Sequence, residues 1–169
     1  MTCNLQFYKE FYLLEEDRKQ NLNNSVNIPI LILTGILSLH FFVFSQDANP
    51  NFLVAGKVLA AINFVIVLLC LYYLVKSFSN LASGYVYREL ANMVEIRKYE
   101  KKLIQEQLNV EKVQLLFEIY IIDEFTICAK HNFEINKYRT ENFAKAKRLL
   151  FISITLSITL STLFIISIV

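Results

Sequence analysis

The sequence is short of residues that break helices and of motifs that carry catalysis. Its 169 residues include three glycines, two prolines, two histidines and no tryptophan. Neither glycine nor proline occurs after Gly84, and helix formers such as Glu, Lys, Gln, Leu and Ala are frequent there. The chain contains no glycine-rich phosphate loop, HExxH, GxSxG or paired CxxC motif. We therefore expect a helical protein that is not an enzyme, has no catalytic residues and needs no cofactor.

Charge is missing from three long apolar runs. Hydrophobic residues make up 55% of the chain, which is too large a share for an ordinary soluble domain of this length. The runs are Ile28 to Phe44, Val58 to Val75 and Leu149 to Val169. Each is close to or above the ~18 apolar residues that are typical of a membrane span. The sequence predicts an all-α membrane protein with three transmembrane helices.

The third run contains ISITLSITLST, residues 152–162, whose alternation of apolar and polar residues is typical of a half-buried strand. A lone strand in lipid would leave its backbone groups unpaired, so a helix is favoured. The helix separates a serine stripe from a threonine stripe, which lie on roughly opposite sides. The residues expected to line a wet lumen are Ser153, Ser157, Ser161 and Ser167. Thr155 and Thr159 are expected to pack against a neighbouring helix. Alternatively, the hydroxyls bond back to carbonyls one turn earlier and have no further role.

Basic residues are distributed unevenly around the three runs. Of the 17 Lys and Arg residues, 13 lie between Lys76 and Arg148, and none lies in the loop from Ser45 to Gly56. The positive-inside bias then places the N-terminus in the cytoplasm and the C-terminus outside. The resulting segments are an N-terminal amphipathic helix (1–27), a transmembrane hairpin (28–75), a cytoplasmic helical module (76–148) and a C-terminal transmembrane helix (149–169).

The cytoplasmic module has to return to the membrane face that it leaves. We expect it to be helical and to turn back near Asn109, a weak helix breaker that would balance the two arms. Its second arm then continues directly into the third span. The run from Val113 to Cys128 is more apolar than one thin hairpin can bury, which indicates subunit contacts and a homo-oligomer.

Three polar features stand out within the predicted helices. Gly56, Ala60 and Asn63 form a stripe of small residues that predicts close helix packing, with pore lining as the alternative for Asn63. His40 is interpreted as a residue at the membrane interface, and a proton relay is the alternative. The third feature is the set Glu124, Cys128 and His131, which shares a helix face. It has fewer than the four ligands of a structural metal site, so no metal is expected.

A basic cluster provides the candidate ligand site. Its residues are Arg97, Lys98, Lys101 and Lys102, with Tyr99 among them. The charges could bind phosphates, and the ring could stack on a base, which points to a nucleotide or a short single-stranded nucleic acid. A solvated helix face is the alternative.

The opening stretch YKEFYLLEEDRKQNLNNSVNIPILILTGILSLHFF carries a family resemblance. It resembles the start of small bacterial membrane proteins encoded in anti-phage defence systems. The whole layout is similar to that of the Hailong system membrane effector and, more loosely, to SLATT effector domains, which have two spans. The resemblance implies an oligomeric ion channel of the bacterial inner membrane that depolarises the infected cell. A nucleotide-oligomer signal from a partner nucleotidyltransferase would control it. The alternative is a non-conducting membrane adaptor that recruits a cytoplasmic partner.

Overall fold

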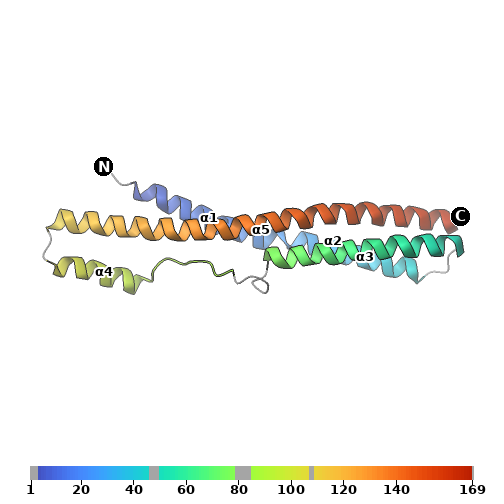
Figure 1. Ribbon diagram of the computed structural model, residues 1–169, viewed down its shortest axis with the longest axis horizontal. Helices are drawn as coiled ribbons and strands as arrows, with labels where there is room; N and C mark the ends of the chain where they lie inside the picture. Colours follow the sequence, from blue (N-terminus) through green and yellow to red (C-terminus); the bar gives the residue numbers. More distant parts are fainter. Residues whose placement is uncertain (1–3, 46–49, 79–84, 107–108, 169) are drawn as a thin grey trace. The chain divides into compact units, whose positions relative to one another are not determined.

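The computed structural model describes residues 4–45, 50–78, 85–106 and 109–168, and within these ranges the chain is helical apart from one extended segment and short turns. The helices, in chain order, are α1 (Leu5–Ser25), α2 (Asn27–Phe44), α3 (Pro50–Phe78), α4 (Met93–Gln105) and α5 (Val110–Ile168) (Figure 1). The predicted all-α fold is confirmed. Parts of the predicted segments at 1–3, 46–49, 79–84, 107–108 and 169 lie outside the described residues.

The three predicted apolar runs all fall within long helices. Three stretches of the structure are long and apolar enough to cross a membrane, Leu5–Phe44, Val54–Phe78 and Val110–Ser167. The first is divided at Val26, between α1 and α2. Pro29 explains this division, because proline has no N–H to donate one turn back and is tolerated only in the first turn of a helix.

Contacts divide the chain into two compact units. The first unit comprises Met1–Asn21 and Tyr85–Lys137, and the second comprises Leu22–Gly84 and Tyr138–Val169. Two of the three boundaries, 21/22 and 137/138, fall inside helices, so α1 and α5 each contribute to both units.

In the second unit, α3 runs antiparallel to α5 in a constant register. Three hydrogen bonds set this register: Asn63 Nδ2 to the Ser153 carbonyl at 3.2 Å, Cys70 Sγ to the Ala146 carbonyl at 3.3 Å, and Arg139 Nε to the Ser77 carbonyl at 2.6 Å. Each step of seven residues along α3 is matched by a step of seven back along α5. A seven-residue repeat is typical of left-handed packing between long helices.

The core of the second unit follows the same repeat. It is built from apolar side chains of α1, α2, α3 and α5, including Val26, Leu33, Val67, Leu74 and Leu150. The opposite helix faces are also apolar but exposed, as shown by Leu31 at 73% and Phe151 at 71% exposure. Exposed apolar faces are expected where helices meet lipid or other subunits.

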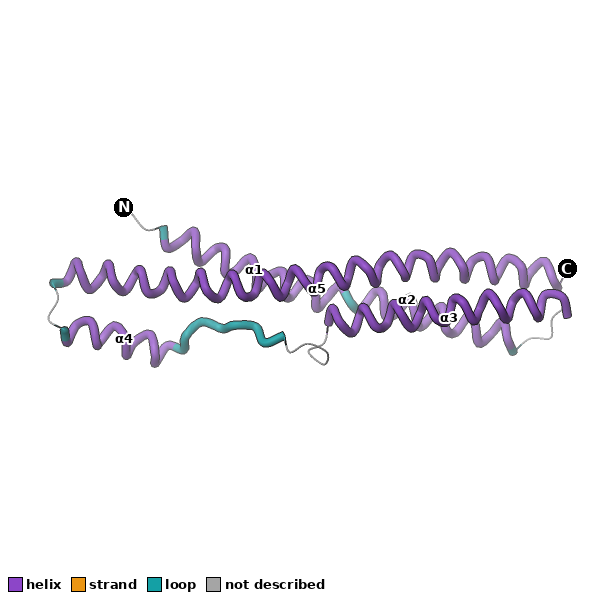
Figure 2. Tube along the Cα trace, viewed as in Figure 1, coloured by secondary structure: helices purple, strands orange, loops and turns teal. Residues whose placement is uncertain are grey.

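The first unit departs from the predicted helical module. Residues 85–92 are extended, so the prediction of a helix throughout 76–148 is wrong for this segment (Figure 2). Asn92 ends the extended segment, and its side chain accepts hydrogen bonds from the Val94 and Glu95 N–H groups, which caps α4. Asn109 caps α5 in the same way through the Lys112 N–H at 2.8 Å. From Val110, α5 continues without a break to Ile168, as expected for an arm that leads directly into the third span.

Candidate functional site

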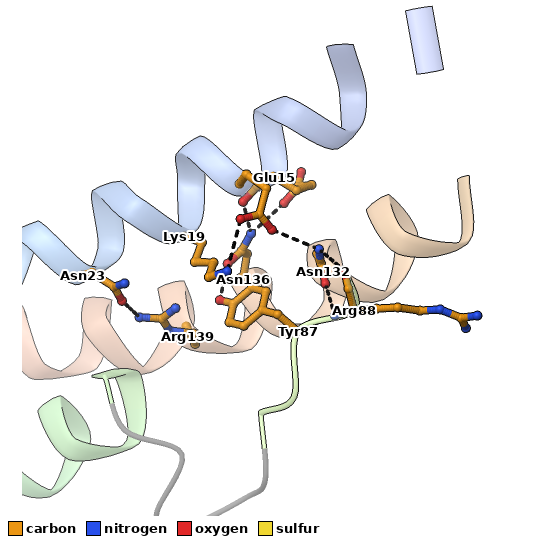
Figure 3. A network of polar contacts seen from close by, with 9 residues as sticks. Glu15, Lys19, Asn23, Tyr87, Arg88, Asn132, Asn136 and Arg139 are labelled. Carbon is orange, nitrogen blue, oxygen red and sulfur yellow. Dashed lines mark hydrogen bonds and ion pairs between the residues drawn. The ribbon is translucent and has the colours of Figure 1, made fainter. Parts of the chain in front are cut away.

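Asn132 binds the extended segment as a neighbouring strand would. Its Oδ1 accepts from the Arg88 N–H at 2.9 Å, and its Nδ2 donates to the Arg88 carbonyl at 3.1 Å (Figure 3). The same amide donates to Glu16 Oε1 at 3.3 Å, and the Asn132 side chain is fully buried. One side chain of α5 therefore supplies both hydrogen bonds that helix formation would have given Arg88. This explains why a stretch without glycine or proline is not helical.

Two neighbouring side chains of α5 hold the same segment. His131 Nε2 lies 2.8 Å from the Val86 carbonyl oxygen, and Cys128 Sγ donates to the Glu89 carbonyl at 3.4 Å. Burial, followed by the nearby Glu124 carboxylate, raises the pKa of the Cys128 thiol and keeps its hydrogen in place for this bond. Cys128 and His131 share a helix face with Glu124, but the Cys128 thiol and the His131 ring contact backbone carbonyls of residues 86–89. The described residues contain no group of three or more potential metal-ligating side chains.

Tyr87 connects the extended segment to α1. Its hydroxyl donates to Asn136 Oδ1 at 2.6 Å, and the Lys19 ammonium lies 4.6 Å from the centre of its ring. Asn136 Nδ2 donates in turn to the backbone carbonyl and the carboxylate of Glu15, at 2.8 and 3.0 Å. Glu15 is 2% exposed, and its other carboxylate oxygen accepts from Arg18 at 2.7 Å.

We call Glu15, Tyr87, Asn132 and Asn136 the polar clamp, since they join α1, the extended segment and α5 (Figure 3). Tyr87, Asn136 and Glu15 are hydrogen-bonded in sequence, and Asn132 is bonded to Arg88 and Glu16, which suits positioning of the three segments. None of the residues of the polar clamp was predicted as a site from the sequence. The sequence pattern that could have indicated the site is the spacing of its asparagines. Asn132 and Asn136 are four residues apart on one helix face, and Arg139 follows three residues later.

A second buried polar group lies among the apolar helices. Asn63 of α3 is fully buried and donates to Ser157 Oγ at 2.9 Å as well as to the Ser153 carbonyl. Nε2 of His40 in α2 lies 3.2 Å from the same amide nitrogen. His40 is 9% exposed within the second unit, and its position at the membrane interface stays a prediction. Gly56 and Ala60 are buried on the same stripe of α3 as Asn63.

The two hydroxyl stripes of α5 lie differently from the expectation. Ser153 and Ser157, expected to line a lumen, are 0% and 4% exposed within the second unit, and Ser161 and Ser167 are half-buried. Thr155 and Thr159, expected to pack, are exposed, as is Thr162. The hydroxyls of Thr155, Ser157, Thr159, Ser161 and Thr162 all bond back to carbonyls four residues earlier. The outward polar stripe of this span is therefore the threonine stripe.

Arg139 secures the end of α3 in the second unit. It is 3% exposed, and its guanidinium donates to the Ser77 carbonyl and, at 2.6 Å, to Asn23 Oδ1 of α1. The final carbonyls of a helix have no partner within it and carry partial negative charge, so a buried arginine both satisfies and stabilises them.

In the basic cluster of α4 the charged side chains are exposed, whereas the tyrosine ring is in contact with another ring. Lys98, Lys101 and Lys102 are exposed, and Arg97 is exposed and paired with Glu100. Tyr99 stacks on Tyr120 of α5, with ring centres 4.2 Å apart. One face of the ring is thus covered, and Tyr99 still lines a pocket together with Arg97, Lys98, Lys101 and Lys102.

Comparison of the chain with known protein families, with characterised proteins and with solved structures finds no match.

Proposed function

We propose that the protein is a homo-oligomeric ion channel of the bacterial inner membrane that acts as an abortive-infection effector in anti-phage defence. The observation that carries the channel is the outward stripe of Thr155, Thr159 and Thr162, in a span without charge from Leu149 onward. Their hydrogens are donated within the helix, so the oxygen lone pairs face outward. Three such hydroxyls share one face of α5, against two on α2, so α5 offers the longer polar line to a water-filled lumen. The threonine stripe replaces the serine stripe as the proposed lumen lining.

Exposed apolar surface on the first unit supports assembly of several chains. Phe7 and Phe11 of α1 are each 50% exposed, although the unit is rich in charge. With Leu14 and Phe133 they line an apolar groove of about 370 Å³ between α1 and α5. Such a groove outside the membrane spans is typical of a contact between subunits. Assembly is required because each chain contributes only one threonine stripe, and several such stripes are needed to surround a lumen.

Lysine orientation supports a membrane boundary near Arg148 and a cytoplasmic first unit. The Lys145 ammonium lies 5.6 Å from the ring centre of Tyr73, and that of Lys147 lies 5.1 Å from the ring centre of Phe143. Both side chains are directed away from the charge-free span, as expected when lysines reach toward headgroups. Together with the positive-inside bias, this supports an N-terminus inside and a C-terminus outside.

The proposed gating signal is a nucleotide or short single-stranded nucleic acid from a partner nucleotidyltransferase, as the N-terminal resemblance implies. Lys98, Lys101 and Lys102 of α4 offer exposed charges for its phosphates. Tyr99 lines a pocket with these lysines, and the ring face that Tyr120 does not cover is the one proposed to stack on a base. Because α5 is one helix from Val110 to Ile168, movement of its first turns can reach the third span without crossing a loop.

Ion flux through liposomes containing the full-length chain tests the channel. Replacing Thr155, Thr159 and Thr162 with valine removes the hydroxyls but keeps the side-chain shape, and should lower flux by at least about tenfold. The matched control is Thr34→Val with Ser38→Ala, two exposed hydroxyls of α2 that also bond back by one turn. Unchanged ion flux in the threonine variant, or an equal loss of flux in the control, would contradict the proposal that the threonine stripe lines the lumen.

The alternative is a non-conducting membrane adaptor, and the apolar groove of the first unit is the observation that favours it. If liposomes containing the chain conduct no ions, with or without added oligonucleotide, the channel is excluded and the adaptor becomes the proposed function.

A further inference from the structure

Arg148 lies in line with the threonine stripe of α5, at the end where the charge-free span begins. It is seven residues before Thr155, which in turn is seven residues before Thr162. Seven residues are close to two helical turns, so the three side chains lie on one face of the helix. All three are exposed within the second unit. The helix face that is proposed to line the lumen therefore carries a positive charge at one end.

The Arg148 side chain lies on the outer surface of α5, next to the first apolar residues of the span. It lines a surface groove of about 500 Å³ with other residues of α5, namely Ala144, Lys147, Phe151 and Ile152. Among the described residues Arg148 forms no ion pair, because the three ion pairs of the structure lie in α1 and α4. Its charge is therefore available to an ion that passes this face.

The other charges near this end of the span do not offset Arg148. Residues 149–169 carry none. Glu141 shares the helix face, but it is seven residues further from the span, or roughly 10 Å along the helix axis. The Debye length is about 10 Å at ~0.1 M salt, so an ion beside the Arg148 guanidinium is affected much less by this carboxylate. Lys145 is directed toward α3, where its ammonium lies 5.6 Å from the ring centre of Tyr73.

We propose that the channel conducts anions such as chloride in preference to cations, and that a ring of Arg148 side chains selects them. The proposal rests on the proposed function, because the ring forms only if the threonine stripes of several chains surround one lumen. Each chain then places one guanidinium at the mouth of that lumen. Arginine stays protonated at physiological pH, so the ring stays positive. Rings of arginine or lysine are typical of anion pores, since they attract anions and repel cations.

The threonine hydroxyls have the opposite preference, but it is weaker. Their oxygens accept hydrogen bonds from water and, because their own hydrogens are donated within the helix, they present partial negative charge to the lumen. A hydroxyl oxygen carries only part of a charge, whereas each guanidinium carries a whole one. We therefore expect the arginine ring to decide which ions enter, and the threonines to provide hydrogen-bond partners for the water that accompanies them.

Reversal potentials of the full-length chain in planar lipid bilayers test the proposal. A KCl gradient separates the equilibrium potentials of chloride and potassium, so the sign of the reversal potential identifies the ion that carries the current. Recordings are made with and without an added single-stranded DNA oligonucleotide. The wild-type reversal potential should lie on the chloride side. Arg148→Glu exchanges a positive for a negative charge in every chain, and should lower the chloride-to-potassium permeability ratio by at least about tenfold. Arg148→Lys keeps the charge and should keep the chloride preference.

The matched control is Lys145→Glu, the same change of charge on a side chain that is directed toward Tyr73. It should leave the chloride preference in place. A wild-type channel that prefers potassium would overturn the anion proposal and leave the channel standing. Unchanged selectivity in Arg148→Glu, or an equal shift in Lys145→Glu, would do the same. No current under any condition would instead exclude the channel, and the selectivity proposal with it. The wild-type recording is decisive by itself if Arg148→Glu does not assemble.

Discussion

Asn132→Leu should release the extended segment from α5 while leaving the helices in place. The change replaces a buried amide with an apolar side chain of similar size, and removes both hydrogen bonds to Arg88 and the one to Glu16. A hydrogen bond contributes about 1 kcal/mol net, so the two bonds to Arg88 amount to about 2 kcal/mol. Since about 1.4 kcal/mol corresponds to a tenfold change, local opening at Arg88 should become roughly 30-fold more frequent.

Hydrogen exchange at single-residue resolution measures this opening directly. The Arg88 amide is the donor to Asn132, so its exchange rate should rise by roughly that factor in the full-length chain in nanodiscs. Amides of α5 around Ala146, in the second unit, should keep their wild-type rates.

The matched control is Asn142→Leu. Asn142 is also a buried asparagine of α5, at 4% exposure, but its amide donates to the Tyr138 carbonyl of its own helix. This variant should leave exchange at Arg88 unchanged. If Asn132→Leu leaves Arg88 as protected as in the wild type, or if both variants accelerate it equally, then the side chain of Asn132 is not what holds the segment.

Further predictions concern the other buried contacts. Arg139→Leu should lower the thermal unfolding midpoint, because two hydrogen bonds from a charged donor, each worth roughly 1.5–3 kcal/mol, are lost; an unchanged midpoint would contradict this. Asn136→Leu should free the Tyr87 ring and raise its fluorescence quenching by iodide, and equal quenching would count against the clamp. The raised pKa of the Cys128 thiol makes its contribution to stability full below pH 9.0 and lost as the pH rises through the folded-state value. Cys128→Ala should therefore flatten the alkaline loss of stability, and an identical pH profile would refute this cause.

Apolar patterning was sufficient to predict the helices that form the second unit. Runs without charge can satisfy their backbone in lipid only as helices, and the spacing of Gly56, Ala60 and Asn63 already indicates one face of α3. Asn109 could be recognised as a break because few other breakers occur between Lys76 and Arg148. These inferences depend on local sequence alone.

The extended segment and the inward serine stripe could not be predicted in the same way. Residues 85–92 are extended because Cys128, His131 and Asn132, distant in sequence, bind their backbone. Likewise, serine and threonine stripes on one helix are chemically alike, and only the position of Asn63 on α3 decides that Ser157 faces inward. Such choices depend on tertiary contacts, which override local preference.

Access of water to the threonine stripe tests the proposed channel most directly. In a chain whose own cysteines are replaced by serine, Thr159→Cys is compared with Ile158→Cys, an adjacent position that is 62% exposed on a neighbouring part of the helix surface. Both are treated in conducting proteoliposomes with a membrane-impermeant methanethiosulfonate. The channel predicts rapid modification at position 159 together with a loss of ion flux, and little modification at position 158. Modification at neither position, or at 158 alone, would contradict a lumen lined by this stripe.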